Sequence, residues 1–501
     1  MDGSDFAAAP PPLRDGAIAA AASPLDTGLD AFLAADDGEA LRLWLGGERL
    51  AGLDAARLRR LLDRDVAAID AALARACDAL LHHPGFQALE SAWRGVRWLA
   101  DTLGADGMTR LRVLDCRWSE LTRDLERAPD FDRSTLFRLV YDEEFGTPGG
   151  VPVSLIVGLY EVRHKPVRGR STDDVGALRA LSGVCAAAFA PIVLGASPDM
   201  FEVERFGDLD LRQSVADTLS DIGHRRLQSL QQAPDTRFVA LAAPRILLRA
   251  PWRGRDAGDC GFRYEERVRA DGRDQLWGVG ALAVAQVCIR AFDEHRWLAA
   301  TRGTVSDRID AGVVSGLPAA DFATDAPGVA IKPALEVNLS AALESDLTRA
   351  GVICIKRCKD TPYLALHSLP TLHRPQVNFT SEIARTNAQL GAVLNYVLCV
   401  SRFAHYLKVM GREWIGSLKS AEECERKLQT WLYGYCSKGD NLSFETKARH
   451  PLQEGRVRLR EIPGAPGAYE CSAWIRPHLQ LDQAVAEFQL TTTLQGAHHA
   501  L

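Results

Sequence analysis

Short apolar segments alternate with segments of helical periodicity through the middle of the chain, and this alternation constrains the fold more than any other feature. A chain built in this way forms a sheet covered by helices, so we expect an α/β fold with mixed sheets. In chain order the pattern predicts a strand at 110–115, helices at 118–128 and 134–145, a strand at 152–160, a helix at 173–189, a strand at 192–194, a long helix at 211–232, a strand within 237–248, further strands near 329–332, 351–356 and 363–366, and a helix at 421–435.

The N-terminal part of the chain is helical by the same criterion. Residues 1–28 are rich in Ala, Pro, Gly and Asp and are expected to form a flexible arm, followed by short helices at 29–35 and 40–45. A long helix at 54–82 and a second at 84–103, which Pro84 begins, suggest a helical hairpin. The apolar positions of the second helix predict that Trp93 is buried.

The C-terminus changes to a period of two. Residues 456–462 and 468–475 alternate in hydropathy and flank a turn at 463–467 that is rich in Pro and Gly, which predicts a β-hairpin. A last run at 484–494 also alternates, so it is expected to form a strand. Such a strand either pairs within its own chain or joins a strand of another chain, and the residues alone favour the first, because terminal strands usually pair internally.

Residues 395–417 read NYVLCVSRFAHYLKVMGREWIGS and combine an apolar helical face with basic side chains on the other faces. The basic residues are Arg402, His405, Lys408 and Arg412. Two interpretations remain open for them: a core helix with a solvated basic side, or a helix whose basic face docks on a partner.

Motifs of catalysis and cofactor binding are absent from the sequence. There is no Walker A, G-x-S-x-G or H-E-x-x-H pattern, and the glycine-containing segments at 146–150 and 278–283 lack the flanking elements of a nucleotide site. The carboxylates at 142–144 and 265–266 are typical of solvated faces. Neighbouring His82 and His83 diverge on a helix, and 354–358 (CIKRC) has no second cysteine pair, so no metal, cofactor or catalytic residue is predicted.

Composition excludes two further classes. The formal net charge of −6 argues against a nucleic-acid binder, which would usually carry a basic domain. The N-terminus lacks the basic and apolar regions of a signal peptide, and no apolar run reaches the ~20 residues that a membrane span needs. We therefore expect a cytoplasmic protein without membrane insertion.

Several long motifs resemble, in the same order, those of the large subunit of the type VI secretion contractile sheath, the TssC/VipB family. They include LLHHPGFQALESAWRGVRWLAD (80–101), YDEEFGTPGG (141–150), RFVALAAPRILLRAPW (237–252), FRYEE (262–266), SRFAHYLKVMGREWIGS (401–417), ETKARHPL (445–452) and PGAPGAYECSAWIRPHLQLD (463–482). The resemblance covers roughly residues 61–494.

The resemblance implies a fold like that of phage tail sheaths and a structural role without catalysis. The expected partners are a small sheath subunit (TssB/VipA-like), copies of the chain itself, the Hcp inner tube, the baseplate of a machine anchored in the cell envelope and, through the N-terminal arm, the AAA+ ATPase ClpV. The first ~55 residues depart from the family pattern, which leaves ClpV recognition the weakest of these implications. The expected division is an N-terminal arm (1–53), an α/β sheath domain (54–370) and an inner sheath segment (371–501).

In this family, neighbouring subunits share a sheet through terminal strands, which reverses the preference for internal pairing. The interface residues implied in the last strand are Val485, Phe488, Leu490 and Thr492, beside the basic helix positions named above. Two alternatives remain: a sheath protein of another phage-tail-like contractile system, and a cytosolic α/β enzyme that uses the carboxylates at 142–144.

Overall fold

The computed structural model divides the chain into two compact units, Met1–Leu89 with Pro251–Gln275, and Glu90–Ala250 with Leu276–Leu501. The expected boundaries at 53 and 370 stay a prediction. The flexible arm expected at 1–28 and the turn at 463–467 lie outside the described residues. The structure describes residues 29–145, 147, 149–211, 214–254, 261–269, 271–304, 309–321, 331–375, 388–414, 421–439, 442–462, 468–478 and 488–495.

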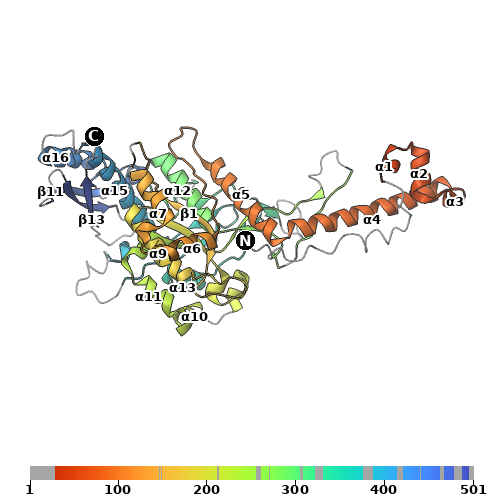
Figure 1. Cartoon of the computed structure of the whole chain (residues 1–501), viewed down its shortest axis with the longest axis horizontal. Helices are drawn as coiled ribbons and strands as arrows, with labels where there is room; N and C mark the ends of the chain where they lie inside the picture. Colours follow the sequence, from red (N-terminus) through yellow and green to blue (C-terminus); the bar gives the residue numbers. More distant parts are fainter. Residues whose placement is uncertain are drawn as a thin grey trace. The chain divides into compact units, whose positions relative to one another are not determined.

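The first unit is mainly helical (Figure 1). Asp54 caps its longest helix by accepting the Arg57 amide at 2.6 Å, which fixes the start of α4 where the sequence predicts it. Near the other end of α4, Asp78 accepts the Tyr264 hydroxyl at 2.6 Å and thereby ties the helix to the 261–275 segment. The helices of this part are α1 (Leu29–Ala34), α2 (Asp37–Leu45), α3 (Gly47–Leu50), α4 (Ala55–Leu81) and the start of α5 (Pro84–Thr102).

The prediction that Trp93 is buried is wrong, since 64% of its surface is exposed. On α5 the buried positions are Gly95 and Leu99, and a Cβ at Gly95 would come within 2.8 Å of Leu282 of α12 (Ala281–His295). Residues two apart on a helix point about 200° apart. The close approach at Gly95 therefore turns Trp93 away from the packed face. The helical hairpin of α4 and α5 stays a prediction.

The second unit is built on a six-stranded sheet in the order β1-β2-β3-β9-β10-β6. β1, β2, β3 and β9 are parallel, and β10 runs antiparallel to both of its neighbours. This mixed sheet with helices around it confirms the predicted α/β class (Figure 1). Its strands are β1 (Ile156–Val162), β2 (Ile192–Ala196), β3 (Val239–Ala243), β6 (Val313–Val314), β9 (Val352–Arg357) and β10 (Leu364–Leu366).

Each face of the sheet has its own hydrophobic core. In β3, Leu241 belongs to the cluster that contains α9 (Asp174–Ala188), whereas Ala240 and Ala242 belong to the cluster that contains α12. Successive residues of a strand point to opposite faces, so a strand that is covered on both sides is apolar throughout. That is why β2 and β3 read as continuous apolar runs rather than as alternating ones.

Two predicted elements differ from the structure. The 110–115 segment forms no ladder, and its Leu111, Val113 and Leu114 are exposed, so the prediction of a strand there is wrong. The single helix predicted at 211–232 is interrupted by a bend at Asp221 and a short 3-10 helix. It divides into α10 (Val215–Ser220), η5 (Ile222–His224) and α11 (Arg225–Gln231). Both predictions rest on the local periodicity of hydropathy. Whether such a segment pairs as a strand or continues as one helix depends on contacts with distant parts of the chain, which the periodicity does not report.

The remaining elements of the second unit surround the sheet or connect its strands. Ser134 accepts the Phe137 amide at 3.1 Å, as expected of a cap, although the helix it begins contains a π-helical turn. No helix among the described residues is both long and apolar enough to cross a membrane. These elements are α6 (Trp118–Arg127), η1 (Phe131–Arg133), α7 (Thr135–Phe137), η2 (Arg138–Asp142), α8 (Glu143–Phe145), η3 (Pro198–Phe201), η4 (Phe206–Leu211), η6 (Pro234–Phe238), β4 (Ile246–Arg249), β5 (Leu276–Gly278), β7 (Ala320–Asp321), β8 (Ile331–Lys332) and α13 (Ala341–Arg349).

Two buried histidines, His164 and His224, stack in the second unit with their ring centroids 3.9 Å apart. Burial, and then the charge of His224, lower the pKa of His164 from 6.5 to about 4. Protonation is therefore easier in the unfolded chain, where a histidine titrates near its ordinary pKa of about 6.5. The stabilisation by neutral His164 is fully present above pH 6.5 and is lost as the pH falls toward 4.

We expect the free energy of unfolding to fall between pH 7 and pH 5, with His164 accounting for roughly 1–2 kcal/mol of the loss. The measurement is urea unfolding of the wild type and of His164→Phe at both pH values. The phenylalanine ring keeps the stacking partner but does not titrate, so the variant should lose less stability than the wild type over this interval. An equal loss in both proteins would contradict the assignment.

Candidate assembly interface

The C-terminal part of the second unit is a small helix-and-sheet module with α15 at its centre. The aromatic ring of Phe403 is completely buried and stacks on Trp297 at 4.2 Å, while Trp431 and Tyr435 pack against it edge-on. These rings join helices that are distant in sequence to the C-terminal strands in one cluster. The elements of the module are α15 (Leu394–Trp414), α16 (Ala421–Tyr433), α17 (Phe444–Arg449), β11 (Leu452–Glu461), β12 (Ala468–Pro477) and β13 (Phe488–Gln495).

The predicted hairpin is confirmed as β11 and β12, which pair antiparallel with Leu459 opposite Cys471. Val457 and Leu459 are buried against α16, whose Glu425 accepts the Leu459 amide at 2.8 Å. The alternation seen in the sequence therefore reports a sheet with one covered face.

The last strand, β13, pairs antiparallel with β12 of its own chain. The register sets Phe488, Leu490 and Thr492 opposite the buried Ile475, Ala473 and Cys471. Val485 lies outside the described residues. Internal pairing, which the residues alone favour, is what the structure of the single chain contains. Exchange of this strand between subunits stays a prediction.

Strand β13 ends the described sheet on one side, and β11 ends it on the other. An edge strand presents unpaired backbone N–H and C=O groups to which another chain can add a strand. On β11, however, the outward amides of Val457 and Leu459 donate at 2.8 Å to Gln429 and Glu425 of α16, so that edge is already occupied. Within the described residues, β13 is therefore the edge that the module offers for sheet extension.

The described basic side chains of α15 do not form a free docking face, because they contact other residues of the same chain. Arg402 donates to the Ser154 hydroxyl at 3.0 Å, and its guanidinium lies 5.1 Å from the Phe292 ring centroid and 4.6 Å from that of Tyr406. The side chain of Arg402 thus binds within the chain. The side chain of Arg412 lies outside the described residues.

Lys408 and His405 are also engaged internally. The Lys408 ammonium is 4.8 Å from the Tyr141 ring centroid and 5.0 Å from that of Phe145, which are cation–π contacts. His405 is 2% exposed, contacts the Ala188 carbonyl oxygen at 2.9 Å, and burial lowers its pKa to about 4. An interface role for these residues stays a prediction. Reversing their charge would disturb the subunit itself, which makes them poor probes of assembly.

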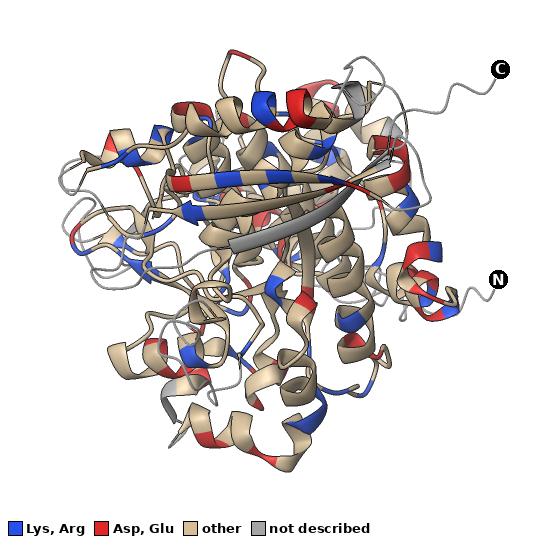
Figure 2. Cartoon of the chain, turned by 90° about the vertical axis from the view of Figure 1, so that its left-hand side faces the viewer, with Lys and Arg blue, Asp and Glu red and all other residues tan. Residues whose placement is uncertain are grey.

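Arginines on β11 form the exposed basic surface of this module. Arg456, Arg458 and Arg460 are exposed and alternate with the buried Val457 and Leu459. Figure 2 shows this sheet facing the viewer. Among the described residues these three arginines have no ion-pair partner. The alternation of Arg with apolar residues at 456–462 contained the information for this basic surface, but we used it only to predict a strand.

Two of the carboxylates considered as catalytic candidates, Glu144 and Glu266, have structural partners. Glu144 forms an ion pair with Arg112 and accepts the Val151 amide at 2.7 Å, and Glu266 accepts the Trp252 amide at 3.0 Å. Carboxylates that satisfy backbone amides hold loops in place.

One group of possible metal ligands was not found from the sequence. Ligand atoms of Glu294, His295 and Asp310 lie within 4.8 Å of one another, with His295 Nε2 3.3 Å from Asp310 Oδ1. Burial, and then the charge of Asp310, raise the pKa of Glu294. No local spacing rule could have found this group, because the chain between the end of α12 and Asp310 brings the ligands together. Mutual hydrogen bonding already accounts for the contact of His295 with Asp310.

Comparison with known proteins finds two adjoining family matches. Residues 63–373 match the family described as EvpB/VC_A0108, tail sheath N-terminal domain, and residues 383–494 match EvpB/VC_A0108, tail sheath gpW/gp25-like domain. The type VI secretion system sheath protein TssC1 of Pseudomonas aeruginosa is 33% identical over 439 residues, which are 87% of this chain and 86% of that protein.

A solved structure of the anti-feeding prophage baseplate aligns with 71% of this chain and 74% of its own, at 10% identity and a TM-score of 0.32. A likeness of this size adds nothing to the sequence matches.

Proposed function

The chain belongs to the EvpB/VipB family of type VI secretion sheath proteins, as a structural large subunit, and we propose that it builds a contractile sheath with a small TssB/VipA-like subunit. In this proposal the sheath surrounds an Hcp inner tube in the bacterial cytoplasm, rests on a baseplate anchored at the cell envelope, and contracts to propel the tube. ClpV then dismantles the contracted form. Such a machine stores its energy in a metastable packing of subunits, so it needs no catalytic residue in this chain.

The observation that carries the proposal is the edge position of β13 in the C-terminal sheet. Ten residues, 478–487, connect β12 to β13 in the sequence, and ten residues can span at most ~35 Å. If β13 moved onto β12 of a neighbouring subunit, the same backbone hydrogen bonds would form between two chains instead of within one. This makes strand exchange a low-cost route to association. Repeated in every subunit, the exchange would link a lattice.

Co-expression with the small subunit tests the proposal. A sheath subunit should become soluble with its partner and form tubes that are visible by negative-stain electron microscopy. Tubes formed by the chain alone would instead favour a single-chain, phage-like sheath. A discrete soluble oligomer without tubes would contradict both.

The exposed arginines of β11 are expected to contact an acidic surface of a neighbouring subunit or of the inner tube. We predict that Arg456→Glu with Arg458→Glu leaves the small-subunit complex intact and reduces the yield of sheaths at least ~10-fold, because charge complementarity becomes repulsion. The readout is the fraction of the chain that sediments as sheath. Because both side chains are exposed, the unfolding midpoint of the complex should not change.

The matched control is Arg449→Glu with Arg426→Glu, which reverses two arginines on the nearby helices α17 and α16. Normal sheath yield in the β11 variant, or an equal loss in the control, would remove the argument for a specific basic surface.

A further inference from the structure

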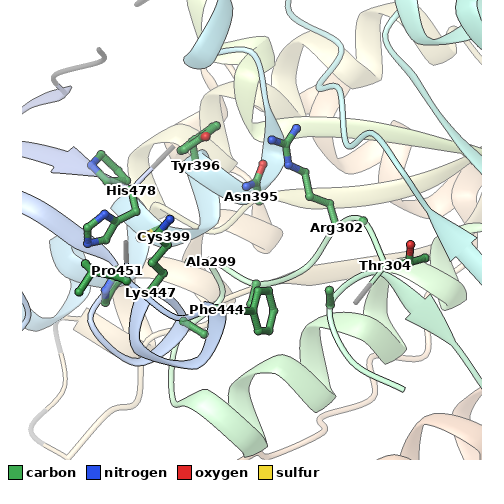
Figure 3. Close-up of a pocket in the computed structure, with 16 residues that line it drawn as sticks. Ala299, Arg302, Thr304, Asn395, Tyr396, Cys399, Phe444, Lys447, Pro451 and His478 are labelled. Carbon is green, nitrogen blue, oxygen red and sulfur yellow. The ribbon is translucent and has the colours of Figure 1, made fainter. Parts of the chain in front are cut away.

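A cavity of about 370 Å³ opens in the second unit where the start of α15, the loop after α12, and α17 meet the end of β12. Figure 3 shows the sixteen residues that line it. Apolar side chains such as Cys399, Phe444 and Pro477 form part of the wall. A volume of this size holds a small molecule or a few residues of a peptide.

The charge of the lining is entirely of one sign. The cationic side chains Arg302 and Lys447 line the cavity together with His478, whose pKa burial lowers from its ordinary value, and none of its sixteen lining residues is Asp or Glu. Among the described residues, the Lys447 ammonium has no hydrogen-bond or ion-pair partner. The His478 Nε2 atom contacts the Ser437 hydroxyl at 2.9 Å. A half-buried ammonium in a cavity that Arg302 also lines, with no carboxylate among the lining residues, favours an anionic occupant.

An independent observation comes from Asn395, in the first turn of the 21-residue helix α15. Its side chain lines the cavity and is 3% exposed, and its Oδ1 atom has no hydrogen-bond partner within the part of the chain that the structure describes. Buried side-chain amides are normally hydrogen-bonded. An amide offers both a donor and an acceptor, which matches the N–H and C=O groups of a peptide backbone.

We infer that this cavity binds a carboxylate-bearing peptide segment of a neighbouring copy of this chain, with Asn395 bonded to its backbone and Lys447 to its carboxylate. A simple inorganic anion would leave the apolar part of the wall uncovered. The chain is itself acidic, with 65 Asp and Glu against 59 Lys and Arg, so its surface supplies carboxylates to a basic cavity. The inference rests on the sheath assembly proposed above.

Zero-length carbodiimide cross-linking tests the contact, because it joins an amine to a carboxylate only where the two touch. Sheaths assembled from equal amounts of ¹⁵N-labelled and unlabelled chain are cross-linked, digested and analysed by mass spectrometry. We expect Lys447 to be coupled to an Asp or Glu of this chain in peptides of mixed isotope, which identify two different copies.

The functional arm compares Lys447→Gln with Lys427→Gln, a lysine on α16 that does not line the cavity. Lys447→Gln should leave the small-subunit complex intact but raise the concentration needed for assembly about tenfold, whereas Lys427→Gln should assemble as the wild type does. Asn395→Ala should also raise the concentration needed for assembly.

Three results would overturn the inference: Lys447 uncoupled in assembled sheaths, Lys447 coupled only within one chain or to the small subunit, or wild-type assembly by Lys447→Gln. If the wild type forms no sheaths at all, the proposed function fails and this inference fails with it. Sheaths that form normally around an uncoupled Lys447 would overturn this inference alone.

Discussion

Deleting residues 484–501 is expected to abolish stable sheaths while the truncated chain still binds its small subunit. The deletion removes all of β13, which pairs with β12 over the eight positions from Ala468 to Ile475. A backbone hydrogen bond contributes about 1 kcal/mol net. If β13 is exchanged between subunits as we propose, loss of the ladder removes several kcal/mol from each joint, and a lattice repeats that loss at every joint.

The design of this experiment must separate lost assembly from lost folding, because β13 also contacts α15 in its own chain. The control is a deletion of residues 496–501 alone, which keeps the whole of β13 and should assemble normally. A second variant, Phe488→Pro, removes one backbone donor and the side chain at the first position of the strand. It should reproduce most of the loss.

Fluorescence imaging of labelled sheaths in cells, with sedimentation of the purified complex, provides the measurement. Sheaths that extend and contract normally in cells carrying the 484–501 deletion would show that strand exchange plays no part. Precipitation of the truncated chain when it is expressed with its small partner would show instead that β13 serves the internal fold.

The sequence predicted the module around this strand well because its signal is local. The alternation of residues 456–462 and 468–475 predicted both the strands and the face they bury, because a hydropathy period of two residues indicates a strand with one buried face. The same holds for β2 and β3, where continuous apolar runs indicate a strand covered on both sides.

The sequence failed where the outcome depends on distant residues. Trp93 lies on an apolar helical face, but the contact of Gly95 with Leu282, nearly 190 positions away in the chain, decides which face is packed. The basic residues of α15 read as a free surface, yet Lys408 meets aromatic rings from α8 and from the end of α9. A charged residue in a helical pattern suggests a solvated face, but aromatic rings from other elements can bind the cation inside the fold, and the local sequence does not show them.

Replacing Phe403 with Ala is expected to lower the free energy of unfolding of the second unit by about 3–5 kcal/mol. Phe403 is completely buried at the centre of the C-terminal cluster, where it stacks on Trp297 and touches Trp431 and Tyr435. Truncation leaves a cavity bounded by large rings that cannot collapse into it easily. A loss of this size is a large part of the 5–15 kcal/mol that stabilises a typical domain.

Trp93→Ala is the matched control, because it removes an even larger aromatic side chain from an exposed site on α5. It should change the free energy of unfolding by no more than ~0.5 kcal/mol. Urea unfolding followed by tryptophan fluorescence measures both variants, and Trp297 beside Phe403 provides a local reporter. If Trp93→Ala were the more damaging change, α5 would have to bury the face that the structure leaves exposed. A small effect of Phe403→Ala would mean that the C-terminal module is not held together by its aromatic centre, and the strands that it positions for assembly would need another anchor.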